Sequence, residues 1–245
     1  YPNHIPITKL SRILLAGSSA VAALRNPYRD DMVAVCSETT ACNALEHMRG
    51  RMLDDETGRR ILKEQPRVNS STVDLKLLRA LPESTLGRQY VNMLNKYNIT
   101  PDSRRDVKFV DDPELAFVLQ RYRETHDFNH LLLGGKVISQ RTNLRGEVAV
   151  KWFEAIQTSL PMCWMAAVGG TTRLSRKRRL RLLQQDLPWI IPTAKSCQFF
   201  MNIYFEERLD QDIDDLRDEM KIYLPHSCRS LEKRYFFAKV SLGKT

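Results

Sequence analysis

Residues 111–135 read DDPELAFVLQRYRETHDFNHLLLGG, and this stretch decides the fold. It opens with the signals of a helix N-terminus, a capping aspartate followed by Pro113 and Glu114, and it ends at Gly134 and Gly135. Between these points apolar residues recur at helical spacing, which predicts a long helix with one stripe against the core. The stripe comprises Leu115, Leu119, Tyr122, His126, His130 and Leu133.

Two of the five histidines in the chain, His126 and His130, lie on that stripe. Residues four apart share a helix face with Cβ atoms about 5–6 Å from each other, so both imidazoles can hold one metal ion. Asp127 follows the first histidine directly. Because buried polar groups need partners, these three residues predict a site. The alternative is that each histidine is a hydrogen-bonded core residue, as most single buried histidines are.

A second helical pattern follows the glycines. Asn143 is a candidate N-cap, and one face before Pro161 carries Leu144, Val148, Trp152, Ala155 and Ser159. Glu147 lies at the edge of that face. If the two helices form an antiparallel hairpin, Glu147 reaches the height of the histidines. The sequence then predicts a cluster of His126, Asp127, His130 and Glu147, suited to zinc or another divalent metal.

The remaining long segments also read as helix, at 10–25, 30–48, 59–64, 83–97, 174–187 and 207–220. We therefore expect an all-α protein, a single multi-helix domain over residues 1–224 with its metal site on a helical hairpin. Residues 225–245 read as a divergent basic tail for which disorder is the simplest interpretation. The five cysteines form no CxxC pair, which favours reduced thiols over a disulfide scaffold.

Composition limits the class of partner. The chain has 245 residues and a formal charge of +9, which favours an anionic partner. No nucleic-acid-binding motif is present, and aromatic residues do not alternate with the basic runs, so we expect no nucleic acid partner. No run of about 18 apolar residues occurs, so no transmembrane helix is predicted.

Two segments each allow two interpretations. The basic run 176–181 fits either an anionic membrane surface or a solvated face over the core. The segment 13–24 is apolar on nearly all sides, which favours a buried core helix, with a lipid-facing helix as the alternative.

Several short stretches carry a resemblance to a known family. They are YPNHIP at 1–6, SETT at 37–40, RYRETHD at 121–127, VKWFEA at 150–155, LPMC at 160–163, LPW at 187–189 and DDLR at 214–217. On these stretches the chain resembles the fourth Coq protein of coenzyme Q (ubiquinone) biosynthesis over most of its length.

The hallmark of that family is HDxxH, then eleven residues, then a glutamate. His126, Asp127 and His130 match the first part, but Thr142 stands where the glutamate is expected. Glu147 follows after sixteen intervening residues, and its surroundings at 141–147 look like those of the family's glutamate. The five extra residues therefore lie in 135–140, in the connecting loop. A longer loop adds little closure entropy, so we expect Glu147 still to reach the metal.

The resemblance implies a fold, a place and an activity. Proteins of that family are described as all-α and peripheral, on the matrix side of the mitochondrial inner membrane. There they join other coenzyme Q biosynthesis proteins in a multiprotein complex, and the resemblance implies the same for this chain. They are implicated in decarboxylation, with or without oxidation, at ring carbon C1 of a polyprenylated hydroxy-methoxybenzoate. Zinc is the metal usually assigned to the hallmark. For this chain it implies a carbon–carbon lyase with His126, Asp127, His130 and Glu147 as catalytic and metal-binding residues.

Two other functions stay open at this point. A non-enzymatic lipid-binding scaffold of the complex would use the metal structurally, in a closed tetrahedral site. A metal-dependent hydrolase ranks last, because His4, His47 and His226 have no aspartate neighbour. The role of Asp127 is also open, since it lies about 100° around the helix from His126. It either binds the metal, orients a histidine or relays a proton.

Overall fold

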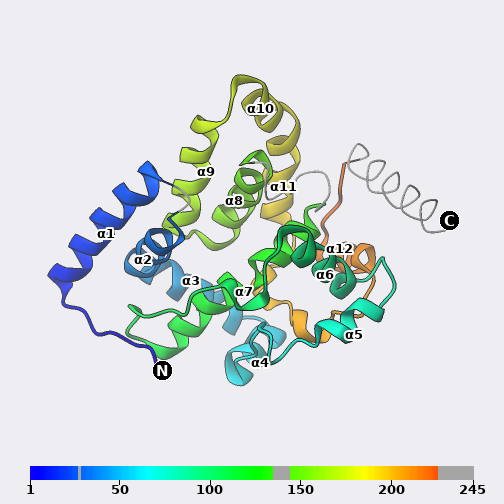
Figure 1. Ribbon diagram of the computed structural model, residues 1–245, viewed down its shortest axis with the longest axis horizontal. Coiled ribbons are helices and arrows are strands. Elements are labelled where there is room, and N and C mark those ends of the chain that lie inside the picture. The colour runs from blue at the N-terminus through cyan, green and yellow to red at the C-terminus, as the bar shows by residue number, and fades with distance from the viewer. Residues whose placement is uncertain (27–28, 135–143, 226–245) are drawn as a thin grey trace.

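The computed structural model describes residues 1–26, 29–134 and 144–225. These residues form helices joined by loops and short 3₁₀ turns, with one isolated β-bridge between Thr85 and Asp212. The predicted all-α single domain is confirmed (Figure 1). The helices are α1 (Lys9–Arg25), α2 (Asp30–Thr40), α3 (Cys42–Leu53), α4 (Glu56–Glu64), α5 (Leu75–Ala80), α6 (Leu86–Tyr97), α7 (Pro113–Leu132), α8 (Leu144–Thr158), α9 (Pro161–Arg173), α10 (Arg176–Arg181), α11 (Leu187–Ser196) and α12 (Ile213–Met220).

Helix α7 is the centre of the molecule (Figure 1), with α3, α4, α6 and α8 packed against it. Its N-terminus is capped as predicted, because Asp112 accepts hydrogen bonds from the backbone N–H groups of Glu114 and Leu115 at 2.8 and 3.1 Å. The prediction of one buried stripe was too narrow, since 17 of its 20 residues are buried. A helix enclosed by others buries nearly its whole circumference, including polar residues that find partners there.

Helix α8 runs back along α7, as the hairpin prediction requires. Tyr122 of α7 contacts Glu154 of α8. Further along α7, His130 contacts Glu147, which comes before Glu154 in α8, so the two helices run in opposite directions. The other sides of α8 pack on α9 and α11. The predicted cap Asn143 and the extra loop residues 135–140 lie outside the described residues.

The predicted helix 30–48 is wrong in one respect, because α2 ends and α3 begins around Ala41. The hydroxyls of Thr39 and Thr40 donate to the carbonyls of Val35 and Cys36 at 2.8 and 2.7 Å. Such hydrogen bonds to the preceding turn compete with the helical ladder and favour a break.

Helices α5 and α9 were not predicted. Pro161 marked the end of a helix in the sequence, but it occupies the first turn of α9, where a proline lacks no hydrogen bond. The predicted helix 174–187 is instead α10, a π-helical turn over Leu182–Asp186, and α11, which continues to Ser196. The predicted helix 207–220 begins later, at Ile213, where Asp212 caps α12.

The interpretation of 13–24 as a buried core helix is also wrong. Helix α1 packs on α2 along one side only, at the edge of the molecule (Figure 1). Its side chains Leu10, Ile13 and Leu14 are 63–68% exposed, and Val21 is 49% exposed. An apolar stripe therefore faces outward.

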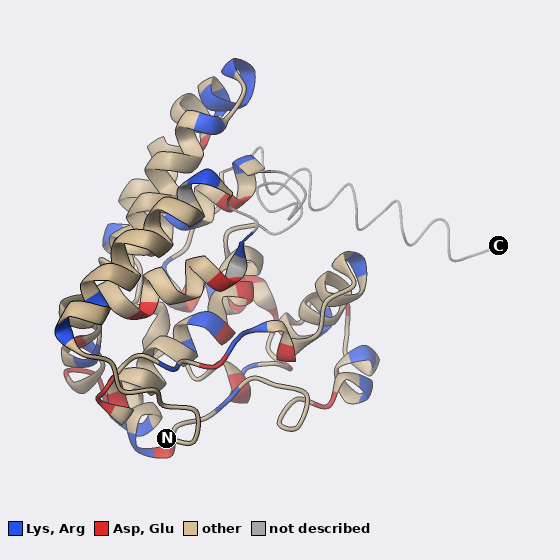
Figure 2. Ribbon diagram, turned by 60° about the vertical axis from the view of Figure 1, so that its left-hand side comes forward, with Lys and Arg blue, Asp and Glu red and all other residues tan. Residues whose placement is uncertain are grey.

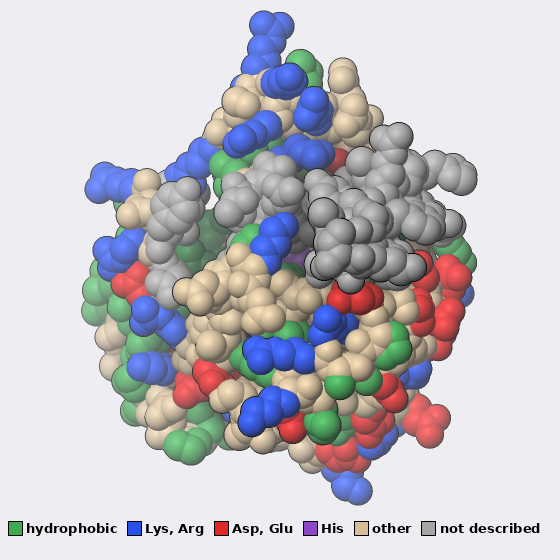
Figure 3. Space-filling view, turned by 45° about the vertical axis from the view of Figure 1, so that its right-hand side comes forward, with side chains coloured by type: hydrophobic (Ala, Val, Ile, Leu, Met, Phe, Trp, Pro, Cys, Tyr) green, Lys and Arg blue, Asp and Glu red, His purple; other side chains and the backbone are tan. Residues whose placement is uncertain are grey.

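Helix α10 is exposed, apart from Arg179, which is partly buried. Its arginines and lysine form the basic end of the molecule, uppermost in Figure 2 and Figure 3. Among the described residues, no helix is both long enough and apolar enough to cross a bilayer. The predicted tail lies outside the described residues, apart from Pro225.

Candidate metal centre

Three of the four predicted ligands come together between α7 and α8. His126 Nε2 lies 3.1 Å from His130 Nε2 and 3.5 Å from Glu147 Oε1. Glu147 Oε2 lies 3.1 Å from His130 Nε2. The two imidazole rings meet edge to face, with an interplanar angle of 85°. Among the described residues these three form the group of side chains able to share one metal ion.

The spacing of the three donors fits a zinc ion. Zinc–ligand bonds of about 2.0–2.1 Å in tetrahedral geometry separate the ligand atoms by about 3.3 Å. The observed separations of 3.1–3.5 Å are close to that value, although the two that involve Glu147 are measured to different oxygens of its carboxylate. Loop 135–143, which the structure does not describe, contains no His, Cys, Asp or Glu. Two histidines and one glutamate, with no fourth protein donor grouped with them among the described residues, is the donor pattern of catalytic rather than structural zinc.

Glu154 fixes the orientation of His126. Its fully buried carboxylate lies 2.6 Å from His126 Nδ1. An ionised carboxylate only accepts hydrogen bonds, so Nδ1 carries the proton and the Nε2 lone pair faces His130 and Glu147. The carboxylate also accepts from three further donors: Tyr122 Oη at 2.8 Å, Asn129 Nδ2 at 2.9 Å and Lys151 Nζ at 2.8 Å.

The charges of the site support this assignment. Burial alone raises the pKa of Glu154, but the neighbouring His126 and Lys151 outweigh it and hold that pKa well below its ordinary value. The pKa of Glu147 is likewise lowered against the effect of burial, by His130 and His126. For Lys151 burial lowers the pKa, and Glu154 more than reverses that shift. The site therefore consists of ionised carboxylates and a protonated lysine.

Asp127 does not join the other three residues. It is buried, and its carboxylate accepts a hydrogen bond from Nη2 of Arg104. The structure thus groups His126, His130 and Glu147 and places Asp127 in an ion pair beside them.

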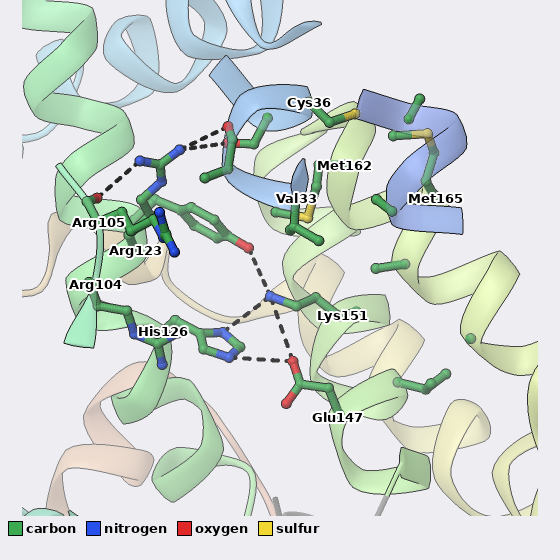
Figure 4. Close-up of a pocket in the computed structure, with 18 of the residues that line it drawn as sticks. Val33, Cys36, Arg104, Arg105, Arg123, His126, Glu147, Lys151, Met162 and Met165 are labelled. Carbon is green, nitrogen blue, oxygen red and sulfur yellow. Dashed lines mark hydrogen bonds and ion pairs between the residues drawn. The ribbon is translucent and has the colours of Figure 1, made fainter. Parts of the chain in front are cut away.

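A cavity of about 320 Å³ opens onto the cluster. Its walls come from α1, α2, α7, α8, α9 and residues 103–105. In Figure 4, His126, Glu147 and Lys151 meet at one end, and the apolar side chains of Val33, Met162 and Met165 gather at the other.

Sequence reasoning missed three residues of this site. Lys151 and Glu154 stand four and seven residues after Glu147, on the same face of α8, so helical spacing alone was enough to find them. Arg104 lies in a segment without regular structure before α7, and no spacing rule predicts its place.

The comparisons with known proteins agree with this architecture. Residues 1–226 match the family model described as coenzyme Q (ubiquinone) biosynthesis protein Coq4. Relatives named as mitochondrial ubiquinone biosynthesis protein COQ4 homologs include those of rat and zebrafish. The rat protein is 48% identical over 92% of this chain and 83% of its own length, and the zebrafish protein is 50% identical over 92% and 81%.

A solved structure shares the fold. It is a Nostoc punctiforme protein provisionally assigned to ubiquinone biosynthesis, with a TM-score of 0.65 over 84% of this chain and 96% of that one. At 17% identity it supports the fold alone. The family model and the two vertebrate relatives span nearly all of the described residues. The chain therefore belongs to the Coq4 family of coenzyme Q (ubiquinone) biosynthesis proteins.

Proposed function

We propose that the protein acts in ubiquinone biosynthesis as a metal-dependent decarboxylase of a polyprenylated hydroxy-methoxybenzoate. His126, His130 and Glu147 would hold the metal, which we take to be zinc. The observation that carries the proposal is the position of His126 and Glu147 at the polar end of a cavity that is apolar at its other end, with His130 within 3.1 Å of both. The proposed substrate likewise has a polar end, the anionic aromatic ring, and an apolar end, the long hydrocarbon tail.

The charge of the cavity lining favours an anion. The lining includes five Arg or Lys side chains against one carboxylate, that of Glu147. The cations are Arg104, Arg105, Arg123, Lys151 and Arg173. Much of the remaining surface is apolar, which suits burial of a polyprenyl chain.

The reaction balances with one proton. The bond between C1 and the carboxylate breaks, carbon dioxide leaves, and the electron pair left on C1 takes up a proton from solvent. A bound divalent ion would supply Lewis-acid stabilisation of the oxygen atoms that bear the developing charge. Lys151, protonated and within 3.4 Å of His126 Nδ1, adds a fixed positive charge at the same end of the cavity. Tyr122 and Glu154 hold that lysine in place.

We also propose a location and partners. The outward apolar stripe of α1 and the basic helix α10 suit a peripheral position on the matrix face of the inner mitochondrial membrane. There the protein would take its substrate from the bilayer and organise other coenzyme Q biosynthesis proteins in a complex.

The second candidate function is a lipid-binding scaffold of that complex, with a structural metal. The same cavity supports lipid binding without chemistry. A closed site would favour the scaffold, whereas three protein donors next to an open cavity favour the decarboxylase.

The experiment that tests the proposal compares the wild type with Glu147→Ala and with Glu219→Ala, a control at a half-exposed glutamate paired with Arg208. Each protein is incubated with prenylated hydroxymethoxybenzoate and zinc, and carbon dioxide and the phenol are followed by mass spectrometry. We expect release by the wild type and the control, and none by Glu147→Ala. No release by the wild type would favour the scaffold, and a hydroxylated product would show an oxidative course.

A further inference from the structure

Asp127 and Arg104 form an ion pair beside the cluster of His126, His130 and Glu147. Asp127 is 6% exposed and is not part of the cavity lining, whereas Arg104 is. The carboxylate binds Nη2 of the guanidinium, so Asp127 lies behind an arginine that faces the cavity. Arg104 and Glu147 line the same cavity and attract each other electrostatically.

The position of Arg104 depends on this contact. The residue follows the 3₁₀ turn Pro101–Ser103, in a segment without a helix or strand to fix its side chain. Its side chain is 24% exposed, and its Nε–H group is buried without a hydrogen-bond partner among the described residues. Buried donors are usually paired, so an arginine whose buried Nε–H has no partner is not positioned by the hydrogen bonds of that group. The ion pair with Asp127 holds it at the cavity.

We propose that Arg104 is the anchor for the carboxylate of an anionic ring ligand, and that Asp127 is a positioning residue that acts through Arg104 rather than a metal ligand. This inference rests on the proposed function and names the group that the site recognises. Arginine pairs with carboxylates through charge-assisted and often bidentate hydrogen bonds. The decarboxylated product lacks this group, so the same contact distinguishes substrate from product.

The test measures binding in metal-stripped protein, without turnover. The probes are a farnesylated 4-hydroxybenzoate and its methyl ester, which differ in charge at the recognised group. We expect the wild type to prefer the acid, and Arg104→Gln to lose about tenfold to a hundredfold of that preference. Arg104→Lys should keep part of it. Arg79→Gln, the same change at an exposed cation outside the cavity lining, should leave the ratio of the two affinities unaltered. Arg173→Gln, at an exposed cation of the lining, should lower the ratio less than Arg104→Gln does.

Asp127→Asn separates the two roles of that residue. A positioning role predicts loss of the acid preference, no further loss when Asp127→Asn is added to Arg104→Gln, and a zinc affinity within about threefold of the wild type. A large loss of zinc affinity in Asp127→Asn would overturn the positioning role.

Equal affinity of the wild type for acid and ester, or an unchanged ratio in Arg104→Gln, would overturn the anchor. So would a wild type that binds neither probe. A loss in Arg173→Gln as large as that in Arg104→Gln would show a general field of the cavity instead of an anchor. These binding results are independent of carbon dioxide release. If the wild type prefers the acid through Arg104 but releases no carbon dioxide, the anchor stands and the decarboxylase is excluded. If it releases carbon dioxide without preferring the acid, the decarboxylase stands and the anchor is excluded.

Discussion

The Nδ1–H group of His126 donates to the carboxylate of Glu154 across 2.6 Å, and this pair leaves Nε2 as the ring nitrogen available to a metal ion. The two residues come from the helices that form the hairpin, α7 and α8. The carboxylate has four donors around it and no exposure to solvent, so it stays ionised and acceptor-only. The orientation of His126 is therefore built into the core.

Replacing Glu154 with glutamine should weaken zinc binding about 10- to 100-fold, because the carboxylate behind a ligating histidine fixes its tautomer and orientation. Zinc affinity is measured by competition with a chromophoric chelator. Glu124→Gln is the matched control. Glu124, on α7, is a buried carboxylate like Glu154, but it pairs with Arg67 and is not part of the cluster. Equal zinc affinity in the two variants would contradict the role of Glu154.

Removing either histidine should remove the metal. We expect His126→Ala and His130→Ala to purify with less than about one tenth of the wild-type zinc, because two remaining donors hold zinc poorly. Elemental analysis of the purified proteins measures this. His47→Ala, which changes a histidine of α3 outside the cluster, should keep full occupancy. Wild-type zinc content in both cluster variants would exclude the site.

Metal removal should lower thermal stability. A ligand that binds only the folded state at about a thousand times its Kd contributes about 4 kcal/mol. For a domain of this size that corresponds to about 10 °C in Tm. Thermal melts of the wild type with zinc and with excess chelator should show this shift, and His130→Ala should show none. A wild-type Tm that ignores zinc would argue against binding to the folded protein.

Reversing the charges of α10 should weaken binding to anionic membranes. The changes are Arg176→Glu, Lys177→Glu, Arg178→Glu and Arg179→Glu, and the assay is co-sedimentation with phosphatidylcholine vesicles that contain cardiolipin. Each cation near an anionic surface contributes about 1 kcal/mol, so the loss should exceed tenfold. A control reverses four scattered exposed cations: Lys63, Arg79, Lys96 and Lys221. Unchanged sedimentation of the α10 variant would identify that helix as a solvated face.

The outward stripe of α1 should contribute little to folding. Ile13 is 68% exposed, so Ile13→Ala should change the free energy of unfolding by less than about 0.5 kcal/mol. Leu119→Ala, at a fully buried position of α7, should lower it by about 2–5 kcal/mol. Urea denaturation of both variants measures the difference. A large loss in Ile13→Ala would mean that α1 is covered in solution.

The sequence predicted what depends on local rules. Helical spacing and the cap at Asp112 located α7, and the same spacing placed His126 and His130 on one face. It failed where distant contacts decide. The stripe of α1 has the composition of a core helix, yet no element covers it among the described residues, and nothing within the segment reveals that.

Asp127 and Arg104 show the same limit. Adjacency to His126 suggested a fourth ligand, but the partner that takes up the carboxylate is an arginine in an irregular segment before the helix. Pairing between an irregular segment and a helix depends on the path of the chain, which spacing does not encode. Glu147 and Glu154 lie on one helix, and their common face was predictable from spacing alone.

The cavity and the metal cluster draw on different parts of the chain. The cluster needs only α7 and α8, which are neighbours in sequence, whereas the cavity wall also needs Ala20 of α1 and Val33 of α2, about a hundred residues earlier. Inherited substitutions in this protein should therefore fall into two groups. If the proposed site holds a metal and a prenylated ligand, substitutions of its three donors in the hairpin would lower metal content. Substitutions that alter the cavity wall in the first two helices would weaken ligand binding and leave metal content unchanged.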